Sequence, residues 1–445
     1  MTLRHRFILA AVLSLVFCFW APGPNPAAKD AVSAAAIKTE NAEMLDRLKL
    51  FADVLAVVRN EYVEDVDDAD LIDAALNGAL NSLDPHSSYV PPVKFEEQKE
   101  AARGEYGGLG IEVIQENNLV KINYALEDAP AYKAGIRTGD YITAVEGERT
   151  FGKTLDEAIE GMKGLAGDPV TVTVLTPDNI TKDVVVIRQV VRRRAVRHRV
   201  EKGQGYVFLE TFNNERLTDD LELALKDIKR QLGVSNIPGL IIDLRGNRGG
   251  LLTESVSVSG LFLDGGEVLS ARGRTSEDTE RYHAEDGQFD KDMRIVVLID
   301  SGSASAAEIV AGALQDRGRA VVVGRRSFGK GSVQSVMPLA INNGALRLTT
   351  QKYYTPSGKS IQGRGIMPDV LVALSPDTGT IRKQFREASF SNALSNADMS
   401  AFEEDHDTID YPPEDWPRTE DYQLQKALDI IRSSRHTDIL SKFEK

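Results

Sequence analysis

Three short runs of apolar, mostly β-branched residues punctuate the second half of the chain. They cover residues 240–244, 294–300 and 320–324, and such uninterrupted runs are typical of strands that are buried on both faces of a parallel sheet. Residues 306–314, after the second run, are rich in good helix formers. The alternation of strand and helix patterns from about residue 195 to 370 predicts an α/β domain with much parallel sheet.

The remaining segments follow other patterns. Residues 96–185 show strand-like alternation and predict a separate, mainly-β unit, whereas the glycine-poor residues 37–81 predict a helical arm. Acidic residues gather in the proline-broken stretch 403–415, which predicts a linker, and a helix is expected at about 420–434. That helix has an apolar face, suited to a partner such as a second subunit, formed by Tyr422, Leu424, Ala427, Leu428 and Ile431.

The N-terminus predicts export. Arg4 and Arg6 precede an apolar run at residues 7–21, which is short for a bilayer span but suits the core of a signal peptide. Residues 1–28 are therefore expected either to be removed or to remain as an inner-membrane anchor of a periplasmic protein. Cys18 is the only cysteine, so no disulfide is expected.

Composition restricts the partners. The chain has 445 residues, of which 42% are hydrophobic and 27% charged, as expected for two or three globular domains. The net charge of -14 argues against nucleic acid as a partner. The six histidines lack the spacing of metal ligands, so neither a metal nor another cofactor is expected. His86 is interpreted as a structural turn residue.

Ser305 and Lys330 are the first candidates for chemistry. Ser305 lies at the predicted start of the helix after residues 294–300, where backbone N–H groups and the helix dipole favour negative charge. Lys330 lies on a glycine-flanked loop after the run 320–324. A serine nucleophile and a lysine base can work without histidine if burial lowers the lysine pKa. A structural interpretation is also open, because Ser305 and Glu308 have the spacing of a capping box.

Two other motifs overlap Lys330. The spacing from Gly324 to Lys330 nearly matches a phosphate-binding P-loop, but Gly331 stands where the magnesium-binding Ser or Thr should be, and a strand pattern follows at 333–339. Ser327 and Lys330 also fit the S-x-x-K pattern of penicillin-binding enzymes, which requires a helical turn. The flanking glycines argue against that helix.

Ser305, Lys330 and Gln334 match in type and spacing the catalytic residues of the carboxyl-terminal processing proteases, peptidase family S41. The chain resembles this family over about residues 40–370, through further blocks in the family's order at residues 83–89, 107–111, 243–250, 353–358 and 365–369. One departure is Arg248, because the family usually has proline before the paired glycines.

The resemblance implies a fold and a domain order. The fold class is an α/β crotonase-like (ClpP/crotonase-type) protease core with an inserted, mainly-β PDZ domain in circularly permuted form and helical N- and C-terminal arms. The expected boundaries are 37–95 for the N-terminal helical region, 96–185 for the PDZ domain, 186–370 for the peptidase core, and 371–445 for the acidic linker and C-terminal helical region.

The resemblance also implies the roles of individual residues. Ser305 would be the nucleophile, Lys330 its base, and Gln334 the residue that orients the lysine. The N–H of Ala306, with that of Gly249 or Gly250, would form the oxyanion hole. The carboxylate-binding loop of the PDZ domain would consist of Gly108, Leu109, Gly110 and Ile111.

These observations predict an exported serine endopeptidase that cleaves protein tails after its PDZ domain captures an apolar carboxyl terminus. An adaptor protein and a second copy of the chain are further expected partners. The alternative is a non-catalytic PDZ binding or scaffold protein of the cell envelope, since a fold can be kept when its chemistry is lost. A hydrolase acting on amides or esters of cell-wall material is a third possibility, against which the PDZ loop argues.

Overall fold

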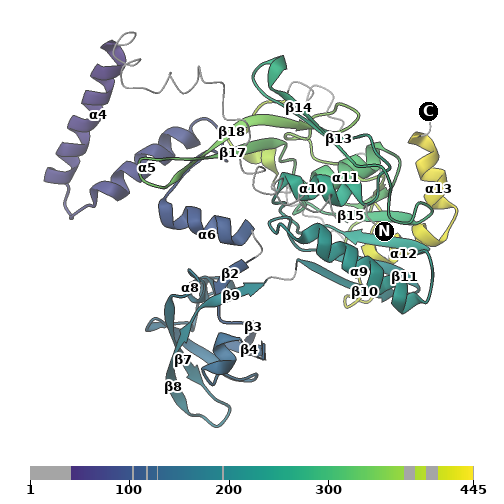
Figure 1. Cartoon of the computed structure of the whole chain (residues 1–445), viewed down its shortest axis with the longest axis horizontal. Helices are drawn as coiled ribbons and strands as arrows, with labels where there is room; N and C mark the ends of the chain where they lie inside the picture. Colours follow the sequence, from purple (N-terminus) through teal and green to yellow (C-terminus); the bar gives the residue numbers. More distant parts are fainter. Residues whose placement is uncertain are drawn as a thin grey trace, which may run out of the picture. The chain divides into compact units, whose positions relative to one another are not determined.

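The computed structural model describes residues 42–102, 105–116, 119–127, 129–192, 195–374, 386–396 and 409–443 (Figure 1). The predicted signal segment and residues 403–408 of the acidic stretch lie outside these ranges. The chain divides into two compact units, Met1–Ala75 and Leu76–Lys445. Within the described ranges, no helix combines the length and the apolar character needed to cross a membrane.

The first unit is helical where it is described. It contains α4 (Ala42–Glu61) and the beginning of α5 (Asp68–Asn81). Arg59 and Asp68 form an exposed ion pair of 3.3 Å between the two helices. Met44, Leu48 and Phe51 of α4 are exposed apolar residues.

A six-stranded sheet forms the centre of the second unit. The order is β10 (Val196–Glu201), β11 (Gln204–Leu209), β12 (Gly239–Asp243), β15 (Arg294–Ile299), β16 (Val321–Gly324) and β19 (Val370–Leu371). Only the pair β10–β11 is antiparallel. The other neighbouring pairs, β11–β12, β12–β15, β15–β16 and β16–β19, are parallel. The predicted parallel sheet and its three apolar strands are therefore confirmed.

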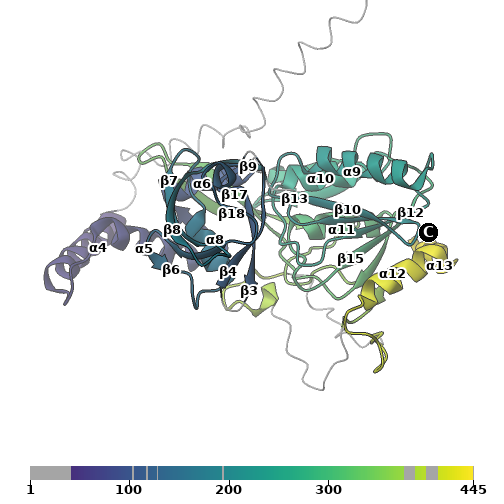
Figure 2. The ribbon, with the colours of Figure 1, turned by 90° about the horizontal axis from the view of Figure 1, so that it is seen from below.

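Helices cover both faces of this sheet (Figure 2). Leu240 and Ile242 of β12 belong to a core with α9 (Leu217–Leu232), α10 (Leu252–Gly260) and α11 (Ala306–Asp316), whereas Ile241 belongs to a second core with α12 (Tyr422–Arg432) and α13 (Arg435–Leu440). Burial on both faces explains the uninterrupted apolar runs. The apolar face of α12 packs on this sheet, so the prediction that it serves a second subunit is wrong.

A second sheet carries part of the candidate site. Its order is β1 (Ser88–Val90), β18 (Ala345–Tyr354), β13 (Glu267–Arg272) and β14 (Thr279–His283), and β17 (Ser332–Pro338) also pairs with β18. The loop that carries Lys330, residues 325–331, is called the lysine loop below. Because β17 begins two residues after Lys330, this loop leads directly into the sheet. The helix α6 (Pro92–Ala102) follows β1.

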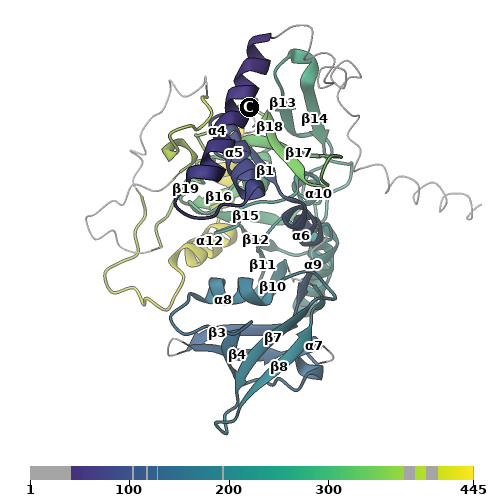
Figure 3. The same cartoon turned by 90° about the vertical axis from the view of Figure 1, so that its left-hand side faces the viewer.

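The strands of the mainly-β unit lie together in Figure 3, and the unit has its own hydrophobic core. Its sheet order is β3 (Ile111–Glu116), β4 (Leu119–Ala125), β5 (Tyr141–Val145), β7 (Pro169–Leu175) and β8 (Thr181–Ile187), with β6 (Glu148–Arg149) on β5. The helices α7 (Pro130–Lys133) and α8 (Leu155–Met162) accompany the sheet, and α8 begins with a capping box of Thr154 and Glu157. The strands β2 (Glu105–Gly108) and β9 (Gln189–Arg192) pair beside it.

Candidate active site

Ser305 occupies the sharp turn between β15 and α11. Its backbone has φ 55° and ψ −118°, a conformation that a residue with a Cβ rarely adopts. The residue is buried, with 6% of its surface exposed. A strained turn from a strand into a helix places a nucleophile at the carboxyl end of a parallel sheet, where α/β folds have their sites.

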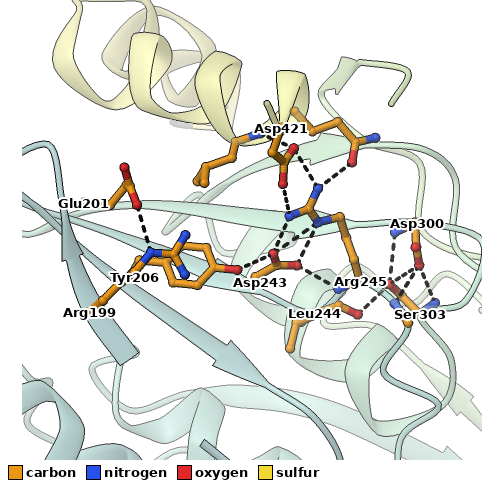
Figure 4. Close-up of polar contacts among 12 residues, drawn as sticks. Arg199, Glu201, Tyr206, Asp243, Leu244, Arg245, Asp300, Ser303 and Asp421 are labelled. Carbon is orange, nitrogen blue, oxygen red and sulfur yellow. Dashed lines mark hydrogen bonds and ion pairs between the residues drawn. The ribbon is translucent and has the colours of Figure 1, made fainter. Parts of the chain in front are cut away.

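Hydrogen bonds join this turn to the glycine-rich loop after β12, residues 244–251 (Figure 4). The hydroxyl of Ser303 donates to the carbonyl oxygen of Leu244 at 2.8 Å. The Oδ1 atom of Asp300 accepts from the N–H of Gly246 at 2.9 Å and from the N–H of Gly302 at 2.9 Å. The two loops are thus held together by side chains that precede Ser305.

Arg245 ties the same glycine-rich loop to the C-terminal helix α12. Its Nη2 atom lies 2.6 Å from Asp243 Oδ2 and 2.6 Å from Asp421 Oδ2 (Figure 4). Asp421 is the N-cap of α12 and accepts from the N–H of Leu424 at 3.0 Å. Tyr206 donates its hydroxyl to Asp243 at 2.7 Å. This largely buried network fixes the position of the glycine-rich loop relative to α12.

Gly249 packs directly against Ser305. A Cβ atom at this position would lie 2.8 Å from Ser305 Cβ and 2.8 Å from Ala306 N, so no larger residue fits without displacement. The Gly249 N–H donates to Asn247 Oδ1 at 2.9 Å. Within the described chain, the N–H groups of Gly250 and Ala306 have no acceptor. Of the two predicted glycine donors, Gly250 is therefore the available one.

Glu308 joins Ser305 to the lysine loop. Its Oε2 atom accepts from the N–H of Ser305 at 2.8 Å and from the N–H of Lys330 at 2.9 Å. Its Oε1 atom accepts from the Ser327 hydroxyl at 2.5 Å and from the Gly329 N–H at 2.6 Å. The capping-box contact from Glu308 to Ser305 N–H is thus present, but the same carboxylate also holds the lysine loop.

The Glu308 carboxylate is fully buried. Burial raises its pKa to about 7, although the hydrogen bonds from Ser327, Gly329, Ser305 and Lys330 each act to lower it. The sequence signalled this residue through its capping-box spacing. Nothing in the sequence signalled that Glu308 also holds the lysine loop, because that loop follows the next strand, β16.

The Lys330 side chain is largely buried. Burial lowers its pKa from the ordinary value; the negative charge of Glu387 is the strongest opposing influence, and Arg347 adds to the lowering. No hydrogen bond joins Lys330 Nζ to Ser305 Oγ in the part of the chain that the structure describes. Burial raises the pKa of the nearby Tyr353 phenol to about 12, and the Ser305 side chain acts to lower it.

Gln334 lies on β17 and contacts hydroxyl groups. Its Nε2 atom donates to Ser332 Oγ at 2.9 Å and to Thr349 Oγ1 at 3.2 Å. Thr349 in turn donates to Asp84 Oδ1 at 3.0 Å, which brings the block at residues 83–89 to the same region. The predicted orientation of Lys330 by Gln334 stays a prediction.

The structure agrees with the rejection of the two overlapping motifs. A strand, β17, follows Lys330 where a P-loop requires a helix. Ser327 is 1% exposed and lies outside any helix, with its hydroxyl bound to Glu308. The S-x-x-K geometry is therefore absent from this loop.

The predicted carboxylate-binding loop joins β2 to β3. Gly110 has φ 72°, and a Cβ there would lie 2.2 Å from the Cβ of Ala129, so the position requires glycine. The N–H groups of Leu109 and Gly110 donate to no acceptor among the described residues. The strand β3 pairs with β4 alone in the described sheet, which leaves its other edge open beside the loop.

His86 and Glu387 form a contact that the sequence did not predict. The His86 Nε2 atom lies 2.9 Å from both carboxylate oxygens of Glu387. The N–H of His86 also bonds to Asp84 Oδ1 at 2.8 Å, consistent with the predicted turn role. Glu387 belongs to the region that was predicted to be a linker, and its partner is 301 residues away, so no local pattern signals the pair.

Family models match three parts of the chain. Peptidase family S41 matches residues 203–372, a PDZ domain matches 121–176, and the N-terminal domain of activating protease CtpB matches 9–92. A carboxy-terminal-processing protease of Bartonella bacilliformis is 46% identical over 357 residues, which are 80% of this chain and 82% of that protein. The chain belongs to peptidase family S41.

This S41 member is a serine-type peptidase of the carboxy-terminal-processing group. A probable CtpA-like serine protease of Staphylococcus aureus is 32% identical over 328 residues, covering 73% of this chain and 64% of that protein. The solved photosystem II D1 C-terminal processing protease is 29% identical, with a TM-score of 0.43, and the match covers 72% of this chain and 86% of that one. The predicted S41 and PDZ domains are confirmed; the crotonase-type arrangement stays a prediction.

Proposed function

We propose that this peptidase cleaves protein chains with a Ser305–Lys330 dyad. Neutral Lys330 accepts the hydroxyl proton as Ser305 Oγ bonds to the scissile carbonyl carbon, and the amine leaves with that proton, so that an acyl-enzyme forms. Water then attacks the ester, Lys330 takes the water proton, and Ser305 regains a proton as the carboxylic acid leaves. Each of these two steps passes through a tetrahedral intermediate, and the N–H groups of Ala306 and Gly250 would stabilise the oxyanion of each intermediate.

The observation that carries this proposal is the shared Glu308 carboxylate. One of its oxygen atoms binds the backbone N–H of Ser305 and that of Lys330, so the two residues are held on adjacent segments. Burial also favours the neutral form of Lys330, as a base requires. In the catalytic step, Lys330 Nζ would approach Ser305 Oγ.

A serine-reactive fluorophosphonate is expected to label Ser305 in the wild-type enzyme. Labelling is expected to slow by roughly 100-fold or more in Lys330→Ala, because the hydroxyl loses its general base. The labelling rate and peptide mass spectrometry measure the effect and identify the modified residue. Labelling at Ser327, or an unchanged rate in Lys330→Ala, would contradict the dyad.

We further propose that the PDZ domain selects the substrate by its free carboxyl terminus. The loop 108–111 offers N–H groups without acceptors, and the open edge of β3 can add a peptide strand. An apolar tail would lie between β3 and α8. The substrates would then be proteins with accessible apolar tails.

Amidation of the substrate's carboxyl terminus is expected to lower kcat/KM by about tenfold, since a charge-assisted contact is lost. Gly110→Ala should remove this preference, because its Cβ would collide with Ala129. Gly147→Ala is the matched control in the same domain: Gly147 has φ 79° and open space around it. Equal preferences in the two variants would argue against capture by this loop.

We also propose that the protein is exported and acts in the periplasm. The segment 1–28 supports this, as a cleaved signal or as an inner-membrane anchor. N-terminal sequencing of the mature protein would distinguish the two, and recovery in the cytoplasm with Met1 intact would refute export. An adaptor and self-association are proposed partners, to be tested by co-purification and by sedimentation of the purified chain.

A further inference from the structure

A segment beyond the S41 match lies against the lysine loop. It comprises residues 386–396, which follow the match at 203–372 and begin with the turn η3 (Glu387–Ser389). The Glu387 N–H donates to the carbonyl of Phe328 at 3.1 Å, and Asn396 Nδ2 donates to the carbonyl of Gln362 at 2.8 Å. The segment is thus anchored at both ends to the loops around Lys330.

Glu387 is the buried centre of these contacts, with 0% of its surface exposed. Its carboxylate lies 2.9 Å from His86 Nε2 and accepts from Gln362 Nε2 at 3.1 Å. The Oε1 atom of Gln362 accepts from the N–H of Gly331 at 3.0 Å. A continuous line of hydrogen bonds therefore runs from His86 through Glu387 and Gln362 to the residue after Lys330.

We propose that Glu387 is a positioning residue whose negative charge, fixed by His86 and Gln362, sets the protonation state of Lys330. Burial of a carboxylate costs free energy unless hydrogen bonds or a cation compensate for it, and His86 and Gln362 supply that compensation here. This inference rests on the proposed role of Lys330 as the base. It assigns to residues outside the matched peptidase domain a part in the active site.

Several charges face Lys330 from different elements. Glu387 from η3, Glu308 from α11 and Asp84 from the loop before β1 favour the ammonium form, while Arg347 from β18 opposes it. Glu387 is the strongest of the favouring charges.

The test measures the pKa of Lys330 directly. Competitive labelling with an amine-reactive reagent across the pH range, followed by peptide mass spectrometry, titrates Lys330 in the full-length wild-type protein, in Glu387→Gln and in the exposed control Glu285→Gln. Loss of the negative charge in Glu387→Gln is expected to lower the Lys330 pKa by about one unit. Glu285→Gln should leave it unchanged.

An unchanged Lys330 pKa in folded Glu387→Gln would overturn the inference. If that variant does not fold, Glu387→Asp retracts the charge by one methylene and should lower the Lys330 pKa by a smaller amount; no change there would overturn the inference equally. The acidic limb of the kcat/KM profile should move with the lysine pKa. A shifted pKa without a shifted limb would refute the dyad, not the influence of Glu387 on Lys330.

Discussion

Ser305→Ala is expected to abolish cleavage of an unstructured protein with an apolar carboxyl terminus, with kcat lower by roughly 10⁴-fold or more. The change removes the nucleophilic oxygen and little else, because Glu308 binds the backbone N–H of this residue and not its hydroxyl. Initial cleavage rates at saturating substrate, with a thermal unfolding midpoint for each variant, measure the effect. Activity that survives Ser305→Ala would refute the mechanism.

Ser327→Ala is the companion variant. It removes a hydroxyl that lies on the lysine loop and binds Glu308, and it tests the S-x-x-K alternative. We expect the loss in kcat to stay within about tenfold, because three of the four donors to Glu308 remain. The Ile366 N–H, which donates to the Ser327 hydroxyl at 2.6 Å, loses its acceptor, so a loss of stability of about 1–3 kcal/mol is also expected. A greater loss in Ser327→Ala than in Ser305→Ala would favour Ser327 as the nucleophile.

The parts of the fold that local patterns determine were predictable. The buried strands β12, β15 and β16 and the helix α11 lie where the apolar runs and helix formers indicated, because a strand covered on both faces needs apolar residues at every position. Ser305 at the start of α11 followed from the same pattern. The chemistry assigned to it came from the family resemblance, since a capping serine has the same local sequence.

The parts that depend on distant contacts were not predictable. The apolar face of α12 could equally cover a sheet or another subunit, and only the second core shows that it covers the sheet. Glu387 lies in a segment without periodicity, and its contacts with His86 and Gln362 arise from the fold. The link from Glu308 to the lysine loop likewise joins segments that a whole strand separates.

Glu308→Gln is expected to lower kcat by roughly 100-fold with a small effect on KM. Each carboxylate oxygen accepts two hydrogen bonds, and an amide replaces one oxygen with a donor, so two buried donors lose their acceptor at about 1–3 kcal/mol each. The lysine loop or the Ser305 backbone must then move, and about 1.4 kcal/mol of lost transition-state stabilisation costs a factor of ten. Steady-state kinetics on Glu308→Gln and the wild type separate the effect on kcat from the effect on KM.

Glu254→Gln distinguishes positioning from general destabilisation. Glu254 is also buried and accepts from the N–H and the hydroxyl of Thr218 at 3.0 and 2.7 Å, but its partner lies at the start of α9. Both variants should lower the unfolding midpoint, whereas only Glu308→Gln should lower kcat. Equal losses of kcat would mean that Glu308 acts through stability alone.

The pH dependence of stability gives an independent check on Glu308. Burial raises its pKa in the folded protein from 4.5 to about 7, so between these values the folded state binds more protons than the unfolded state, and this group's contribution to stability falls as pH rises. The wild type should therefore lose stability relative to Glu308→Gln between pH 4.5 and about 7, as measured by thermal unfolding. Under the proposed mechanism, catalysis would need the ionised carboxylate, because only this form accepts all four hydrogen bonds. The raised pKa means that the protonated form contributes more to stability. A pH-independent difference between the two proteins would show that Glu308 has the same pKa in the folded and unfolded states, so that burial does not raise it.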